Sequence, residues 1–130
     1  MQPATPFLEA AVEHGVLVLR VLHRQIQGED IAAGLKDELE GIVRQYNAKQ
    51  VVLDLSRCCY VSSIAFWPLL SLRKRLSEAG GRLIVCGLSG MVLDVFTNTK
   101  MVSNGGNTAA LFEMAPDRDT AVARLAHPAL

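Results

Sequence analysis

The chain of 130 residues lacks several signals that assign a function to other proteins. Its 13 basic and 13 acidic residues cancel, so there is no long-range positive field to attract nucleic acid. No apolar run approaches the ~20 residues needed to span a bilayer. No charged leader followed by an apolar run and a cleavage site opens the chain. These absences predict no direct binding of nucleic acid, no membrane insertion and, by default, a reduced cytoplasmic setting.

Cysteine is scarce and unevenly placed. Three cysteines are an odd number, which argues against a disulfide framework. Cys58 and Cys59 are adjacent, and Cys86 is remote from both. No spacing of cysteine and histidine matches a zinc site, and the three histidines are scattered along the chain. We therefore expect thiols that pack in the core or in loops, and no bound metal ion.

No catalytic or nucleotide-binding motif is present either. The sequence contains neither a Walker-type loop nor a dinucleotide fingerprint. The segment Gly87–Gly90 lacks the Gly-x-Ser-x-Gly spacing of a hydrolase elbow. The sequence therefore predicts a protein that is not an enzyme and that requires no cofactor.

The chain does contain alternating strand and helix signals. Val16–Leu22 and Val51–Leu55 are dense apolar runs typical of strands covered on both faces. Between Ile31 and Tyr46, apolar residues recur at three- and four-residue steps, which predicts an amphipathic helix. The other expected features are strands at Phe7–Val12, Leu83–Cys86 and Ala109–Met114, helices at Gly90–Thr97 and from Asp117 or Asp119 onward, an N-cap at Asp30 and a helix stop at Asn47. The pattern predicts a single α/β domain over residues 1–130, with loose ends at about 1–6 and 126–130.

The segment from Val51 to Phe66 is the most informative part of the sequence. It predicts a buried strand that ends at Asp54, a short polar loop, and then Ser62 and Ser63 at the start of a helix. Sheets of α/β proteins place functional residues at the carboxyl ends of their strands, and a helix N-terminus can accept a phosphate. Two interpretations stay open: the serines only cap the helix, or one of them is a regulated hydroxyl.

The helix after these serines contains a proline that constrains its start. If Ser63 were the N-cap, Pro68 would lie one turn too deep and would remove a hydrogen bond to Ile64. Either the regular helix starts near Phe66 after an irregular or 3₁₀ lead-in, or the helix kinks at the proline. Phe66 and Trp67 point about 100° apart on a helix, so we expect one in the core and the other at the surface, with burial of both as the alternative.

These residues resemble the central signature of STAS domains, the anti-sigma factor antagonist modules of bacterial partner switching. The shared features are an apolar strand ending in Asp54, an aromatic-aliphatic pair, and hydroxyl residues that open a helix. Gly80–Leu88 resembles the family's next strand and loop, and Met91–Phe96 its third helix. The resemblance extends from about Gly15 to about Leu125. It implies a mixed sheet of four to five strands with helices mainly on one face.

The resemblance also implies a function. The expected protein is a non-enzymatic anti-sigma factor antagonist whose partner is an anti-sigma factor with a serine-kinase fold. The expected partner-binding residues are Asp54, Ser62, Ser63, Ile64 and Trp67. Ser63 is the preferred phosphate acceptor and Ser62 the second candidate, because Ser63 directly precedes an apolar residue, as the acceptor does in the scaffold-type stress-signalling members. A homodimer stays open.

The central motif departs from the family pattern at three positions. Ser62 stands where Asp is usual, Ile64 where the acceptor hydroxyl is usual, and Ala65 where Gly is usual. The alternative is therefore a constitutive STAS subunit of a larger complex, such as a lipid-transporting ABC system or a stress-signalling scaffold, that docks without phosphate. Turn-forming residues over Val102–Thr108 predict a mobile insertion relative to the family.

Overall fold

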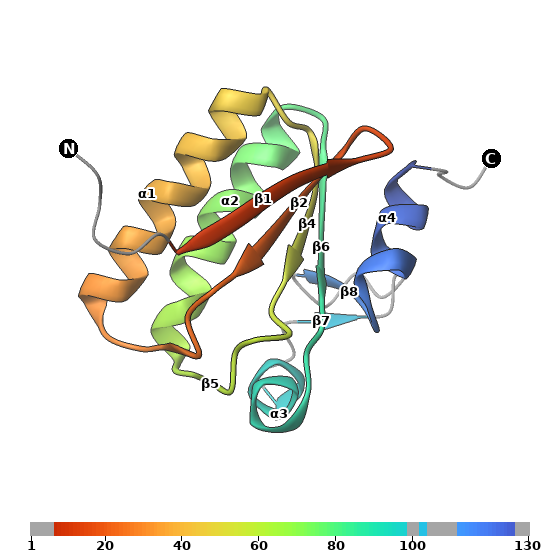
Figure 1. The fold of residues 1–130 in the computed structure, drawn as a ribbon. Helices are drawn as coiled ribbons and strands as arrows, with labels where there is room; N and C mark the ends of the chain where they lie inside the picture. Colours follow the sequence, from red (N-terminus) through yellow and green to blue (C-terminus); the bar gives the residue numbers. More distant parts are fainter. Residues whose placement is uncertain (1–6, 99–101, 104–111, 127–130) are drawn as a thin grey trace.

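A computed structural model describes residues 7–98, 102–103 and 112–126 of the chain. The described strands of the main sheet are β1 (Leu8–Glu13), β2 (Val16–Val21), β4 (Gln50–Asp54), β6 (Arg82–Cys86), β7 (Val102–Ser103) and β8 (Phe112–Ala115). Their spatial order is β1-β2-β4-β6-β8-β7 (Figure 1). β1 is antiparallel to β2, and the other neighbours are parallel. The predicted mixed sheet and its central strand, β4, are confirmed; the two-residue β7 adds a short sixth strand at one edge.

Helices cover both faces of the sheet unequally. α1 (Glu29–Tyr46) and α2 (Phe66–Glu78) pack side by side on one face, and the shorter α4 (Arg118–Ala126) lies on the other (Figure 1). α3 (Gly90–Asn98) lies at the carboxyl end of the central strands, near β5 (Tyr60–Val61). The two long helices therefore form the predicted main cover, and α4 is the helix of the opposite face.

The ends of the helices show which capping predictions hold. The N-cap of α1 is Gly28, whose φ of 85° suits glycine, so the predicted cap at Asp30 is wrong. Asp30 lies instead in the first turn, where a carboxylate stabilises the helix dipole. Asn47 ends α1 in the left-handed conformation, as predicted. Asp117 caps α4, since its Oδ1 accepts a hydrogen bond of 2.8 Å from the N–H of Thr120.

The start of α2 follows the first of the two predicted alternatives. Ser63–Ala65 form a 3₁₀ turn, η1, and the α-helix begins at Phe66. Pro68 therefore falls in the first α-helical turn, where a missing N–H removes no helical hydrogen bond. No kink at the proline is needed.

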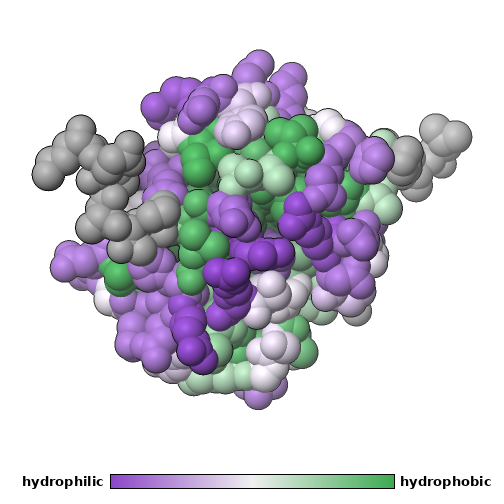
Figure 2. All heavy atoms as spheres, in the orientation of Figure 1, coloured by the Kyte–Doolittle hydropathy of each residue, from purple (hydrophilic) through white to green (hydrophobic). Residues whose placement is uncertain are grey.

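Seen from the side on which β1 lies in front, the surface is mixed (Figure 2). Hydrophobic residues appear there in groups between hydrophilic ones. The large hydrophobic side chains that are exposed lie on four different elements: Val12 on β1, Tyr46 on α1, Trp67 on α2 and Met91 on α3. Within the described ranges, no helix is long and apolar enough to cross a membrane.

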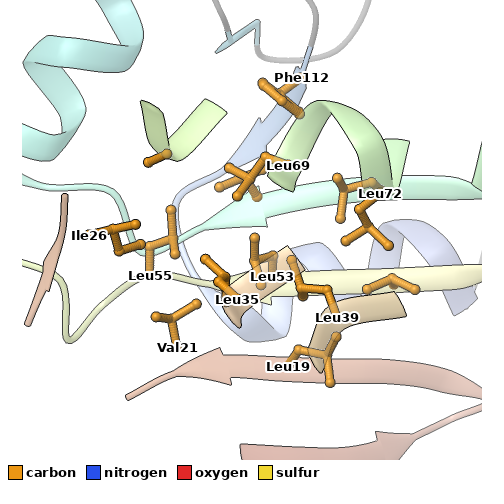
Figure 3. Close-up of a cluster of buried hydrophobic side chains, with 14 of the residues drawn as sticks. Leu19, Val21, Ile26, Leu35, Leu39, Leu53, Leu55, Leu69, Leu72 and Phe112 are labelled. Carbon is orange, nitrogen blue, oxygen red and sulfur yellow. The ribbon is translucent and has the colours of Figure 1, made fainter. Parts of the chain in front are cut away.

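Alternate residues of the central strands build two separate cores. Leu53 of β4 points to the α1–α2 side, where Leu35 and Leu39 of α1 and Leu69 and Leu72 of α2 surround it (Figure 3). On the other face, residues of β2, β4, β6 and β8 pack against residues of α4: Val16, Val18, Val52, Ile84, Cys86 and Ala115 against Ala121, Val122 and Leu125. This double burial explains why the β4 run is apolar at consecutive positions.

Three expectations concern residues beyond the described ranges. Of the predicted mobile insertion, only Val102–Ser103 are described, and they form β7. The predicted last strand is present as β8, while residues 109–111 are outside the description. The predicted loose ends fall mostly outside it as well.

Candidate partner-binding face

The loop between β4 and α2 is fixed by a small second sheet that the sequence did not predict. β3 (Gln25–Ile26) pairs in parallel with β5 (Tyr60–Val61). The N–H of Ser62 then donates to the carbonyl of Ile26 at 3.0 Å. This pairing fixes the backbone directly before η1, and so it positions the two serines at the carboxyl end of the sheet.

Neither serine hydroxyl is used as a helix cap. Ser62 is the N-cap of η1, yet its side chain makes no capping hydrogen bond. Ser62 is half-buried, and Ser63, the first residue of η1, is exposed. Within the described part of the chain, neither hydroxyl has a hydrogen-bond partner. Of the two interpretations of the serine pair, simple capping is therefore not what the side chains do.

The aromatic pair that follows divides between core and surface, as predicted. Phe66 is buried and packs edge-on against Phe96, with ring centroids 4.9 Å apart. Trp67 is 46% exposed. Ser62, Ser63 and Ile64 precede it at the start of α2, and we call these four residues the serine face.

A polar network between α1 and α2 holds the tryptophan in place. Lys36 Nζ lies 5.9 Å from the centroid of the Trp67 ring and 3.1 Å from Glu40 Oε2. Ser71 Oγ donates to the same carboxylate oxygen at 2.9 Å. The hydrogen bonds from Lys36 and then from Ser71 lower the pKa of Glu40 below its ordinary value. The network joins residues one turn apart on each helix, so the two helices fix the exposed ring jointly.

A groove adjoins the serine face. It has a volume of about 440 Å³ and is lined by Glu29, Asp30, Ala33, Ile64 and Trp67. One wall is the acidic first turn of α1, and the other is the beginning of α2. Sequence reasoning missed this groove because it depends on how two helices, 20 and more residues apart in sequence, pack against each other.

Asp54 is buried at the carboxyl end of β4 and is not part of the serine face. Its side chain is 4% exposed. Oδ1 accepts the N–H of Ser56 at 2.9 Å, and Oδ2 lies 3.5 Å from Arg20 Nε. A Cβ on Gly87 would lie only 2.7 Å from Oδ1, so the loop after β6 closes tightly over the carboxylate. Asp54 therefore supports the loop after β4 from within.

With this geometry established, comparison with known proteins places the chain. The family model of the STAS domain matches residues 8–113. The chain belongs to the STAS domain family. It is 31% identical over 100 residues to BtrV of Bordetella bronchiseptica, named as an anti-sigma factor antagonist, in an alignment covering 65% of this chain and 80% of the relative. The predicted grouping with the anti-sigma factor antagonists is thus confirmed.

Solved STAS structures share the fold at lower identity. An anti-sigma factor antagonist from Mycobacterium paratuberculosis superposes with a TM-score of 0.73 at 19% identity, over 91% of this chain and 92% of that one. The unphosphorylated form of the antagonist SpoIIAA gives a TM-score of 0.63 at 15% identity, over 92% and 98%. These likenesses confirm the STAS-like sheet and helix arrangement.

The structure thus sorts the predicted site residues. Ser62, Ser63, Ile64 and Trp67 lie close together at the start of α2, whereas Asp54 is buried at the carboxyl end of β4. In the described ranges, no three His, Cys, Asp or Glu side chains are grouped so that they could hold a metal ion. The arrangement offers an exposed hydroxyl beside an exposed aromatic ring, which suits the docking of a protein.

The three thiols differ in accessibility. Cys58 and Cys86 are buried, and burial raises the pKa of each thiol to about 12. The Cys58 thiol donates to the carbonyl of His23 at 3.2 Å. Cys59 is exposed. The expectation of core- or loop-packed thiols holds for Cys58 and Cys86.

Proposed function

We propose that the chain binds an anti-sigma factor with a serine-kinase fold through the serine face, and that phosphate on Ser63 ends this binding. The observation that carries the proposal is the Ser63 hydroxyl. It is exposed, it opens η1, and no described residue engages it. A hydroxyl in this position is open to a kinase and central to the docking surface. The protein would act by binding alone, without catalysing a reaction.

Trp67 supports the choice of this face. Exposed tryptophans are enriched among the residues that dominate binding energy at interfaces. The ring is 46% exposed, and the ammonium of Lys36 on the facing helix lies over it. An anchor that is ordered before binding loses little conformational entropy when the partner docks.

Phosphorylation would change the character of this surface. A phosphate adds about −1.5 to −2 charges at neutral pH. At Ser63 that charge would lie next to the apolar Ile64, near the acidic wall formed by Glu29 and Asp30. Docking on it would require the partner to desolvate the phosphate, and Lys36, the cation that lies over Trp67, is already paired with Glu40. The unphosphorylated SpoIIAA structure supports a phosphate-controlled state in this fold.

Ser63 is the better of the two acceptor candidates. Ser62 is half-buried and its backbone N–H is bonded to Ile26 of β3, so it is less accessible to a kinase than Ser63. The buried Asp54 would contribute indirectly, by holding the loop that presents the serines. We place this activity in the cytoplasm, where such a partner acts on transcription.

Variants of Ser63 test the proposal against its purified cognate anti-sigma factor. Ser63→Asp should weaken binding by about 1–3 kcal/mol, since it puts charge into an interface that fits a neutral side chain. Ser63→Ala should bind like wild type. Ser77→Asp is the matched control, because Ser77 is exposed near the far end of α2. If Ser63→Asp also binds like wild type, the partner uses another face.

A further inference from the structure

The groove beside the serine face contains two carboxylates without a described counter-ion. Glu29 and Asp30 are exposed in the first turn of α1. Among the described residues, neither takes part in an ion pair. Lys36, on the next turns of the same helix, is paired with Glu40. The negative charge of this wall is therefore available to a binding partner.

The opposite wall of the same groove is apolar. Ile64 and Trp67 supply it, and Ala33 of α1 also lines the groove. A stabilising effect on the α1 dipole would account for carboxylates in the first turn. It would not account for an open groove of about 440 Å³ with an exposed indole across from them.

From this combination we infer that the groove receives a basic side chain of the partner, with arginine the better fit. The aliphatic stem would lie along Ile64 and the indole of Trp67, and the guanidinium would reach Glu29 and Asp30. Arginine stacks on aromatic rings and binds carboxylates through two parallel hydrogen bonds, which an ammonium group does not. The inference rests on the proposed function, because the occupant is a residue of the anti-sigma factor.

The groove and Ser63 carry separate parts of this interface. Ser63 does not line the groove, although its neighbour Ile64 does. The acidic wall would provide affinity and choice of partner, and the serine would provide control. The two parts can therefore be tested independently.

The test measures binding of the purified cognate anti-sigma factor by titration calorimetry. Glu29→Gln combined with Asp30→Asn should weaken binding about tenfold, and Trp67→Ala about thirtyfold. The matched control is Glu78→Gln with Asp119→Asn: it removes the same charge from exposed helix positions away from the groove, and should stay within about twofold of wild type. Raising the salt concentration should weaken wild-type binding more than binding of the Glu29/Asp30 variant. Melting curves of each free variant confirm that it is folded.

The arms of this experiment distinguish two failures. If Ser63→Asp weakens binding but the Glu29/Asp30 variant binds like wild type, the proposed function stands and the groove inference is wrong. The inference is equally wrong if the control pair weakens binding as much, because net charge alone would then be responsible. If Ser63→Asp, Trp67→Ala and the Glu29/Asp30 variant all bind like wild type, both proposals fail. Charge reversal of single basic residues on the partner would then identify the occupant. The occupant is the residue whose reversal weakens binding to wild type but does not weaken binding further to the Glu29/Asp30 variant.

Discussion

The ammonium group of Lys36 lies 5.9 Å from the centre of the Trp67 ring, so a cation of one helix fixes the exposed aromatic residue of the next. The same ammonium is ion-paired with Glu40, which in turn accepts a hydrogen bond from Ser71. The serine face is therefore held by contacts between α1 and α2 as well as by the core beneath it.

Replacing Lys36 by methionine should loosen this arrangement. The variant loses a cation–π contact and a helix ion pair, which together are worth about 1 kcal/mol of unfolding free energy. Trp67 is the only tryptophan in the sequence, so fluorescence reports its environment directly, and quenching by acrylamide should increase. Lys74→Met, at an exposed position on α2, is the control and should leave both quantities unchanged. Unaltered quenching in Lys36→Met would show that the lysine does not order the ring.

Glu40 predicts how the network responds to pH. Its pKa in the folded protein is lowered from the ordinary value of 4.5, chiefly by the hydrogen bond from Lys36 and then by that from Ser71. Because this pKa is lower in the folded than in the unfolded protein, ionised Glu40 stabilises the fold above about pH 4.5. This stabilisation is lost as the pH falls through the folded-state pKa of Glu40. Wild type should therefore lose more unfolding free energy between about pH 6 and pH 3.5 than Glu40→Gln does. Parallel curves for the two proteins over this range would contradict the assignment.

Much of this fold can be predicted from the sequence because its signals are local. The apolar density of Val51–Leu55 indicates a central strand, and the position of Pro68 indicates either a helix start near Phe66 or a kink, of which the structure shows the first. The exposed place of Ser63 follows from the same local pattern. These features need no knowledge of distant contacts.

The remaining features depend on tertiary contacts that the sequence does not encode locally. β3 and β5 have two residues each, too few for a periodic pattern, and exist only because they pair. Asp30 was the predicted N-cap of α1 because aspartate is a preferred capping residue. The observed N-cap is Gly28, because the backbone enters the helix there with a positive φ, which favours glycine. The acidic groove arises only when the beginnings of α1 and α2 meet.

Two glycines should respond in opposite directions to alanine. Gly81 adjoins Lys49, and a Cβ there would lie 2.0 Å from the Lys49 carbonyl oxygen, so Gly81→Ala should cost about 1–3 kcal/mol of unfolding free energy. Gly41 lies inside α1 with no atom within 4 Å of an added Cβ, so Gly41→Ala should stabilise by about 0.5–1 kcal/mol. Urea unfolding measures both. If Gly81→Ala leaves the unfolding free energy unchanged, the backbone at Lys49 and Gly81 can move apart to make room for the added methyl group.

The three thiols should react at very different rates. Burial raises the pKa of Cys58 and of Cys86 to about 12, so almost no thiolate is present at about pH 8. Cys59 is exposed. A thiol reagent should therefore label Cys59 rapidly in the native protein and the other two only after unfolding, as counted by mass spectrometry. Cys59→Ser should abolish the fast reaction, and rapid labelling of Cys58 or Cys86 in that variant would contradict their buried positions.

The most direct test of the account is to phosphorylate the protein and measure binding before and after. The purified chain is incubated with its cognate kinase and ATP, the modified residue is mapped by mass spectrometry, and the dissociation constant for the anti-sigma factor is determined for both forms. The account predicts phosphate on Ser63, none in Ser63→Ala, and binding of the phosphorylated form weakened by about tenfold or more. Full binding by a protein in which neither Ser62 nor Ser63 accepts phosphate would contradict the regulated antagonist and support the constitutive STAS subunit in its place.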